Sequence, residues 1–220
     1  SWGYFAAGSS YGISKESNTE NDHNEDRVFI GKNGDRFAVI DGVGGFIGGE
    51  GAAEAVVSAL DKKIPLEDVL AKASDIMRER KNFSGAAVAA LLERRESSDF
   101  DCLVVGDCRC IMLKDGAIVG RTRDQTVVER NVSKGHVTED EALFVENKHV
   151  VSNLVRYSGI KKDPNKYVIP NTFHGMLVVA SDGVTDNITD EELAGLSVNR
   201  TPEEFVQIVI QVVTWRMKYE

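Results

Sequence analysis

Three apolar runs in this sequence end abruptly in an aspartate. The first, FAVIDGVGG at 37–45, has the pattern of a buried strand that stops at Asp41 and enters a segment with three glycines in four residues. LVVGD ends in Asp107, and LVVASDG ends in Asp182 and Gly183. A single strand-end aspartate is most often a turn or capping residue. Three of them predict that several strands direct carboxylates at one place.

Two further acids extend this pattern. HNEDRVF places Glu25 and Asp26 immediately before another strand-like segment. Five carboxylates in one pocket would repel one another, and each would be driven toward protonation. A divalent cation removes that conflict, and a set of oxygen ligands without His or Cys suits Mg²⁺ or Mn²⁺ rather than zinc or copper. Gly42 would also let a backbone carbonyl approach such an ion closely.

Composition excludes several other classes of function. The net charge of −9 argues against a nucleic acid or an anionic membrane surface as the main partner. Three cysteines without zinc-site spacing are typical of reduced thiols, and the N-terminal SWGYFAAGSS lacks the features of a signal peptide. No apolar run approaches the roughly 20 residues of a membrane span. We therefore expect a cytoplasmic protein with one domain, 1–220.

Hydrophobic periodicity predicts strands and helices in separate groups. Strand patterns cover 27–31, 36–40, 86–92, 101–106, 110–122 as a hairpin turning at Asp115-Gly116, and 176–180. Helix patterns cover 48–60 and 66–80, and three capping boxes predict further helices at Thr138/Glu141, Thr189/Glu192 and Thr201/Glu204. Because most strands follow one another as hairpins, antiparallel sheet packed against helices is favoured over alternating parallel units. The glycine-rich GGFIGGEG lacks the Gly-Lys-Ser/Thr ending of a nucleotide-binding loop.

Taken in order, these motifs resemble the metal-dependent serine/threonine protein phosphatases of the PPM, or type 2C, class. The resemblance covers nearly the whole chain, although each motif alone is weak. It is carried by NED at 24–26, VIDGVGG at 39–45, SGAAVAALL at 84–92, VGDCRCIMLKDG at 105–116, RTRDQTVVERNVSKGHVTEDEA at 121–142 and LVVASDGVTDNITDEEL at 177–193.

The resemblance implies an α+β fold, a four-layer α-β-β-α sandwich of two mostly antiparallel sheets flanked by helices. It also implies hydrolysis of phosphoserine and phosphothreonine in phosphoproteins by a water activated by two Mn²⁺ or Mg²⁺ ions, with a third ion in some members. Each candidate catalytic or metal-binding residue then has a role. Asp41 would bridge two ions, the Gly42 carbonyl would bind one, Asp182 would bind the first, Glu25 would face the second, Asp26 would hold a metal-bound water, and Asp107 would help to bind the third.

Two departures from the family pattern keep an alternative open. Relatives usually carry an arginine that grips the substrate phosphate where this chain has Asn21, and Lys15 or Arg27 would have to compensate. Relatives also end in a strand led by Asp-Asn that completes the first metal site, whereas this sequence ends at WRMKYE; DNIT at 186–189 is not assigned that role. The alternative is a pseudophosphatase, a regulatory binding module with an impaired metal site. For either function we expect a monomer.

Overall fold

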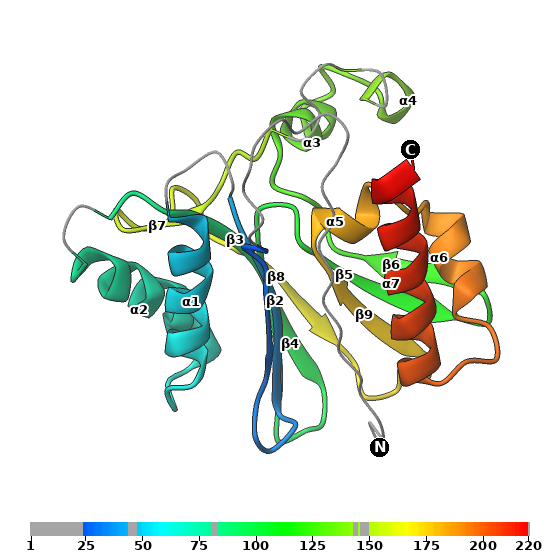
Figure 1. The fold of residues 1–220 in the computed structure, drawn as a ribbon, viewed down its shortest axis with the longest axis horizontal. Helices are drawn as coiled ribbons and strands as arrows, with labels where there is room; N and C mark the ends of the chain where they lie inside the picture. The colour runs from blue at the N-terminus through cyan, green and yellow to red at the C-terminus, as the bar shows by residue number, and fades with distance from the viewer. Residues whose placement is uncertain (1–23, 44–47, 81–82, 143–144, 146–149, 220) are drawn as a thin grey trace.

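The computed structural model describes residues 24–43, 48–80, 83–142, 145 and 150–219. Within them the chain forms two antiparallel sheets with helices on their outer faces (Figure 1). No helix in these ranges is long and apolar enough to cross a bilayer. The predictions made for Lys15 and Asn21 lie outside the described residues.

The larger sheet contains the strands nearest the N-terminus. Its order is β1-β2-β3-β4-β8, and β7 pairs with the start of β3. All of these pairs are antiparallel, with Arg27 opposite Ile40 and Ala89 opposite Val105. The strands are β1 (Arg27–Ile30), β2 (Arg36–Gly42), β3 (Ala86–Arg94), β4 (Phe100–Val105), β7 (Val155–Arg156) and β8 (Asn165–Ile169).

The smaller sheet has the order β6-β5-β9 in the described part of the chain. It comprises β5 (Arg109–Lys114), β6 (Ala117–Arg121) and β9 (Met176–Ala180). Asp115 and Gly116 both have positive φ, 52° and 75°, and form the turn between β5 and β6. The Asp-Gly hairpin turn predicted from the sequence is confirmed, because such turns need positive φ at both central residues.

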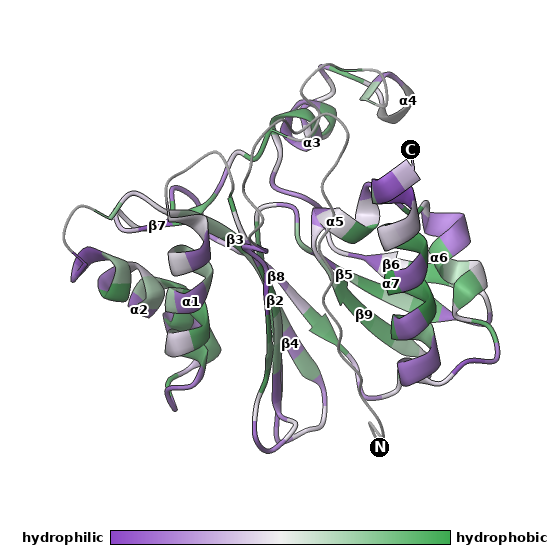
Figure 2. Cartoon of the chain, viewed as in Figure 1, coloured by the Kyte–Doolittle hydropathy of each residue, from purple (hydrophilic) through white to green (hydrophobic). Residues whose placement is uncertain are grey.

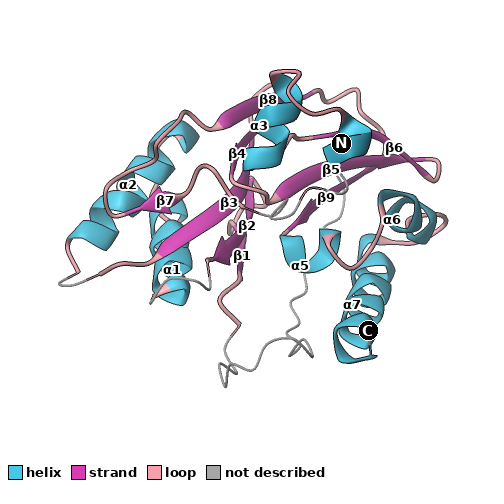
Figure 3. Cartoon of the chain, turned by 90° about the horizontal axis from the view of Figure 1, so that it is seen from above, coloured by secondary structure: helices cyan, strands magenta, loops and turns pink. Residues whose placement is uncertain are grey.

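Helices cover the outer faces of both sheets. α1 (Gly49–Leu60) and α2 (Leu66–Arg78) lie on the larger sheet, whereas α6 (Asp190–Leu196) and α7 (Pro202–Tyr219) lie on the smaller one (Figures 1 and 3). α3 (Val127–Ser133) and α4 (Glu139–Ala142) stand above the end of the sandwich, and α5 (Asp182–Thr185) follows β9.

Three hydrophobic interiors separate these layers. Alternate residues of β3 divide between two of them, because successive side chains of a strand point to opposite faces. Ala87 and Leu91 pack toward α1 and α2, whereas Val88 and Leu92 pack between the two sheets. A third cluster, including Ile111 and Phe205, joins the smaller sheet to α6 and α7. Figure 2 shows that apolar residues are frequent along the strands of both sheets. The predicted four-layer α+β sandwich is confirmed.

Most predicted elements are present with bounds shifted by one or two residues. All three predicted capping boxes form, since each threonine hydroxyl accepts the backbone N–H of the glutamate and each glutamate accepts the threonine N–H. α3 was not predicted, although Thr126 caps it by accepting the N–H of Glu129 at 3.1 Å. The short strands β7 and β8 and the single-turn α5 were also missed.

The Glu192–Arg216 pair predicts a pH dependence of stability. Hydrogen bonds from Arg216, at 2.9 and 2.6 Å, and from the Thr189 N–H hold the pKa of Glu192 at about 2. Because this folded-state pKa is depressed, the stabilisation is present above the unfolded pKa of about 4.3 and is lost as pH falls toward 2. Glu192→Gln should lower the melting temperature at pH 7 but have no effect near pH 2. An equal loss at both values would contradict this explanation.

Candidate metal centre

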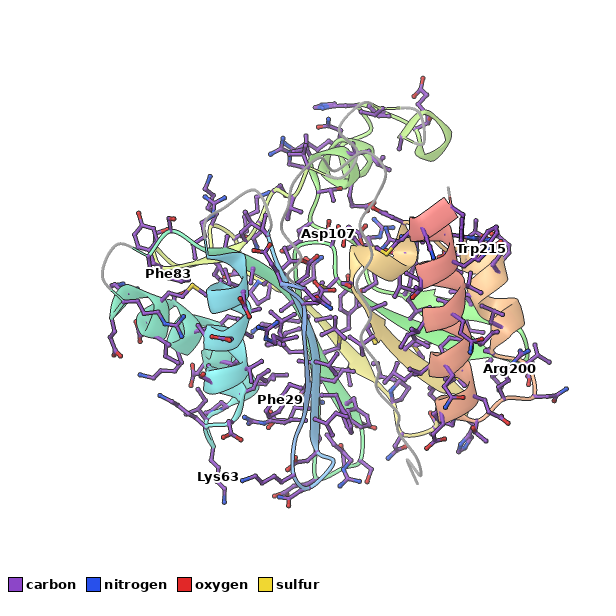
Figure 4. The ribbon with its side chains drawn as sticks, viewed as in Figure 1. Phe29, Lys63, Phe83, Asp107, Arg200 and Trp215 are labelled. Atoms are coloured by element: carbon purple, nitrogen blue, oxygen red, sulfur yellow. The ribbon has the colours of Figure 1, made fainter. Side chains whose placement is uncertain are left out.

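The topology brings the predicted acidic residues to one end of the sandwich. β1 begins where its antiparallel partner β2 ends, so Asp26 lies near Asp41. Asp107 lies between β4 of one sheet and β5 of the other. Asp182 begins α5, one residue after β9, and the end of β9 pairs with the start of β5. Figure 4 shows Asp107 at this end, between the two halves of the molecule.

Asp41 lies at the centre of the acidic cluster, which we define as Asp26, Asp41, Asp107 and Asp182. Burial is the main cause that raises its pKa to about 10, and the charges of the other three aspartates add to this shift, with Asp182 contributing most among them. Its carboxyl group also interacts by hydrogen bonds with those of Asp26 and Asp182. Among the described residues, the positive charge of Arg27 acts on Asp26, where it opposes the rise in pKa.

Asp26 is oriented from two sides. Its Oδ2 accepts a hydrogen bond from the Ser181 hydroxyl at 2.9 Å, and its backbone N–H donates to the side chain of Asn24 at 2.8 Å. Burial raises the pKa of Asp26, and the charge of Asp182 raises it too, whereas the Ser181 hydrogen bond opposes this shift. The serine preceding Asp182 thus connects β9 to the segment before β1.

Asp107 is 7% exposed in the gap between the two sheets. Its pKa is raised to about 7, first by burial and then by the charges of Asp182, Asp124 and, more weakly, Asp186. Asp124 is fixed by a bidentate pair with Arg109, whose Nη2 lies 2.6 Å from its Oδ2. Asp107 is thus part of the same electrostatic network as Asp41.

Glu25 occupies a different position from the four aspartates. Its carboxylate accepts a backbone hydrogen bond from Glu50 in the first turn of α1, while burial raises its pKa. Glycines allow this close packing, since a Cβ on Gly49 would come within 2.9 Å of the Glu25 carboxylate. A Cβ on Gly42 would lie 2.5 Å from the Gly49 carbonyl. Glu25 therefore lies between the end of β2 and the start of α1.

Cys108 lies beside the acidic cluster without being a candidate nucleophile. The thiol is fully buried, and burial together with the charges of Asp41 and Asp107 raises its pKa well above the usual value. A nucleophilic cysteine needs a lowered pKa. Cys102 and Cys110 are also buried and free. This agrees with the prediction of reduced thiols.

The described side chains are not already arranged as a metal site. No group of three His, Cys, Asp or Glu residues in the described ranges is placed to hold an ion. The pKa of Asp41 is raised to about 10, mainly by burial and then by the charge of Asp182, so its carboxyl group retains its proton near neutral pH when no ion is bound. Asp26, Asp41, Asp107 and Asp182 thus influence one another electrostatically, whereas Glu25 interacts mainly with the start of α1.

Sequence reasoning missed several supporting residues. Gln125 donates its backbone N–H to the Gly106 carbonyl at 2.6 Å, and its side-chain oxygen accepts from Asn153 at 2.8 Å and from Gly106 at 3.3 Å. Ser181, Arg109 and Asp124 lie within the family-like motifs, but no role was predicted for them. Their partners are distant in sequence, so spacing alone carries no signal for these contacts.

Comparison with known proteins agrees with this architecture. No family model matches the sequence. The serine/threonine protein phosphatase PstP of Mycobacterium tuberculosis is 26% identical over 189 residues, which cover 78% of this chain but 35% of PstP. The serine/threonine phosphatase stp of Listeria innocua is 22% identical, covering 86% of this chain and 83% of that protein. The crystal structure of Stp1 from Staphylococcus aureus matches with a TM-score of 0.78 and 19% identity, over 98% of this chain and 96% of that one.

The chain is similar in sequence to serine/threonine phosphatases and shares the fold of solved PPM phosphatases. The catalytic domain of PstP, which matches this chain with a TM-score of 0.66 over 89% of its length, has been solved in complex with two manganese ions. The chain spans about a third of the length of full PstP, 35%.

Proposed function

We propose that this chain is a PPM-type phosphatase domain that hydrolyses phosphoserine and phosphothreonine in proteins with Mn²⁺ or Mg²⁺. The observation that carries the proposal is the acidic cluster, in which three aspartates from other segments act on Asp41 and the pKa of Asp41 is raised to about 10. A structural role does not account for this arrangement, because clustered buried carboxylates oppose folding unless something neutralises them.

The residues fit hard divalent cations. Every candidate side chain is a carboxylate, and the cluster is partly enclosed between the sheets. Mg²⁺ and Mn²⁺ prefer such oxygen ligands, and Mg²⁺ is commonly held by one or two carboxylates together with waters. A cation would also replace the proton that Asp41 otherwise retains. The donor chemistry and the charge of this site are thus those that such an ion requires.

We assign the roles of these residues from the family resemblance and their placement. Asp41 would contact both ions, and Asp182 and the Gly42 carbonyl would contact the first. Glu25 and Asp26 would face the second. Asp107 would contribute to a third. When bound, the ions would supply charge neutralisation for the phosphate and a hydrolytic water of lowered pKa.

The protein's own contribution is to orient these ligands. The Ser181 hydroxyl fixes Asp26, and the first turn of α1 fixes Glu25. Both contacts join parts of the chain on different layers, so the ligand set depends on correct packing of the whole sandwich. Pre-positioned groups of this kind lower the cost of reaching the reactive geometry.

Arg27 does not replace the phosphate-gripping arginine of relatives in this arrangement. Its guanidinium binds the carboxylates of Glu50 and Glu54 on α1. It also donates to the carbonyls of Asn24 and Asp26, each at 2.9 Å. Arg27 therefore links α1 to the segment that contains Glu25 and Asp26.

The proposal includes a substrate class, a cellular compartment and an oligomeric state. The partner would be a phosphoprotein rather than nucleic acid or a membrane, in keeping with the net charge of −9, and the protein would act as a cytoplasmic monomer with one domain. The relatives are phosphatases by name, which does not favour the alternative of a pseudophosphatase.

The proposal predicts strict metal dependence. The protein should hydrolyse a small aryl phosphate in the presence of Mn²⁺ or Mg²⁺, lose this activity in excess EDTA, and regain it when Mn²⁺ is restored. The reason is that the carboxylates cannot themselves neutralise the phosphate. Release of inorganic phosphate measures the effect. Undiminished turnover in excess chelator would show that the proposed function is wrong.

A further inference from the structure

A pocket lies away from the acidic cluster, where α2 ends. This cavity of about 390 Å³ is lined by Met77, Arg78, Arg80, Phe83 and Tyr157. We call it the arginine–aromatic pocket. Met77 is fully buried at its base, whereas Tyr157 is 47% exposed. Figure 4 shows Phe83 between the upper ends of α1 and α2.

The two arginines of the pocket make different contacts. Arg80 lies over the ring of Phe83, 5.5 Å from its centroid, and donates to the Gly51 carbonyl at 3.0 Å. The side chain of Arg78 is 58% exposed, donates to the Tyr157 carbonyl at 3.2 Å and pairs with Asp75 at 2.8 Å. Backbone and ring contacts thus position both guanidinium groups at the pocket.

The charge of this pocket contrasts with that of the whole chain. The protein has a net charge of −9, yet two arginines and one aspartate meet here, and no carboxylate in the described ranges pairs with Arg80. Guanidinium groups bind carboxylates through paired hydrogen bonds, and aromatic walls accept apolar groups. The ligand that matches this chemistry is an acidic peptide segment with an apolar side chain.

The first turn of α1 separates the pocket from the proposed active site. A Cβ on Gly49 would meet the Glu25 carboxylate, and one on Gly51 would meet Arg80 at 2.9 Å and the Phe83 ring at 3.0 Å. The two sites are therefore about one helix width apart, roughly 10–12 Å. An extended peptide advances about 3.3–3.6 Å per residue, so about three to five residues span that distance.

We propose that the arginine–aromatic pocket binds an acidic residue of the substrate about three to five positions from the phosphorylated residue. This rests on the proposed function, since the phosphorylated residue must lie at the acidic cluster. The pocket thus selects phosphoproteins with acidic sequences beside the phosphorylation site. It contributes to substrate binding and leaves hydrolysis itself to the acidic cluster.

Hydrolysis of paired phosphopeptides tests this selection. Two phosphothreonine peptides should be compared with Mn²⁺, one carrying glutamates three to five residues from the phosphothreonine and the other glutamines. We expect about fivefold higher kcat/KM for the acidic peptide, through KM, as an exposed ion pair of about 1 kcal/mol allows. Arg78→Gln and Arg80→Gln should each reduce this preference without changing aryl phosphate turnover. Lys63→Gln, at the other end of α1, is the control.

Peptide binding separates failure of this inference from failure of the proposed function. A fluorescent acidic peptide without phosphate should bind the metal-free protein saturably by anisotropy, and the double variant Arg78→Gln/Arg80→Gln should lose that binding. Arg78 is largely exposed, so its single variant remains informative if Arg80→Gln fails to fold. Absence of peptide binding by the parent protein, or an equal loss in Lys63→Gln, would overturn the inference even if the enzyme hydrolyses aryl phosphate.

Discussion

Asp41→Asn is expected to stabilise the metal-free protein while abolishing its metal-dependent hydrolysis. Asparagine has the size of the aspartate, and its amide group can donate hydrogen bonds to the neighbouring carboxylates of Asp26 and Asp182. It does so without requiring the folded protein to take up a proton. The substitution therefore keeps the packing of β2 but removes the charge that a metal ion needs.

The stabilising effect depends on pH in a defined direction. The pKa of Asp41 is raised to about 10 in the folded protein, mainly by burial. Between the unfolded pKa of about 3.9 and this value, folding must be accompanied by proton uptake, so the stability of the parent falls as pH rises. The asparagine of the variant takes up no proton, and the melting-temperature difference between variant and parent should grow from pH 4 to pH 8.

The measurement uses thermal unfolding in EDTA together with Mn²⁺-dependent turnover. We expect the variant to melt on the order of 5 °C higher at pH 8, as about 2 kcal/mol at roughly 2–4 °C per kcal/mol implies. Added Mn²⁺ should raise the melting temperature of the parent and have little effect on the variant. Turnover should fall by about 10³-fold or more, or about 4 kcal/mol of lost transition-state stabilisation.

Glu96→Gln is the matched control, because Glu96 is an exposed acid in the turn between β3 and β4, away from the acidic cluster. It should leave both the metal response and turnover unchanged. A lower melting temperature of Asp41→Asn in EDTA would indicate that the carboxylate has a structural role. An unchanged response to Mn²⁺ would show that Asp41 is not a ligand.

The acidic cluster could be predicted from the sequence because its members have a local signal. Asp41, Asp107 and Asp182 each end an apolar run, and β2 and β4 run in the same direction because both are antiparallel to β3, so their C-termini lie at the same end of the larger sheet. The hairpin at Asp115-Gly116 and the three capping boxes are local patterns as well. In these patterns the interacting residues are only a few positions apart, so they can be recognised in a single sequence.

The contacts that support the cluster have no such signal. Ser181 reaches Asp26 across 155 positions in the sequence, and Asn153 reaches Gln125 across 28. The position of Glu25 against α1 depends on how closely Gly42 and Gly49 approach, which packing alone determines. The arginine–aromatic pocket combines residues after α2 with Tyr157 after β7, and β7 has only two residues. These features depend on contacts between residues that are distant in the sequence, so only the three-dimensional structure shows them.

Gly106→Ala is expected to destabilise the protein strongly, through the turn that carries Asp107. Gly106 has φ of +89°, and a Cβ there would lie 2.1 Å from Cγ1 and 2.4 Å from Cβ of Val88, which is buried between the sheets. Overpacking costs about 1–3 kcal/mol, and the positive φ adds about 1–2 kcal/mol. A total of about 3 kcal/mol lowers the melting temperature by roughly 6–12 °C in a chain of this size.

Gly135→Ala separates the two contributions, because Gly135 also has positive φ, +69°, but no atom lies within 4 Å of its Cβ position. That variant should lose only about 1 kcal/mol, or roughly 2–4 °C. Gly106→Ala should also reduce Mn²⁺-dependent turnover, since Gln125 holds both backbone groups of Gly106 next to Asp107. Equal losses of stability in the two variants would refute the steric argument, because the contact with Val88 is what distinguishes them.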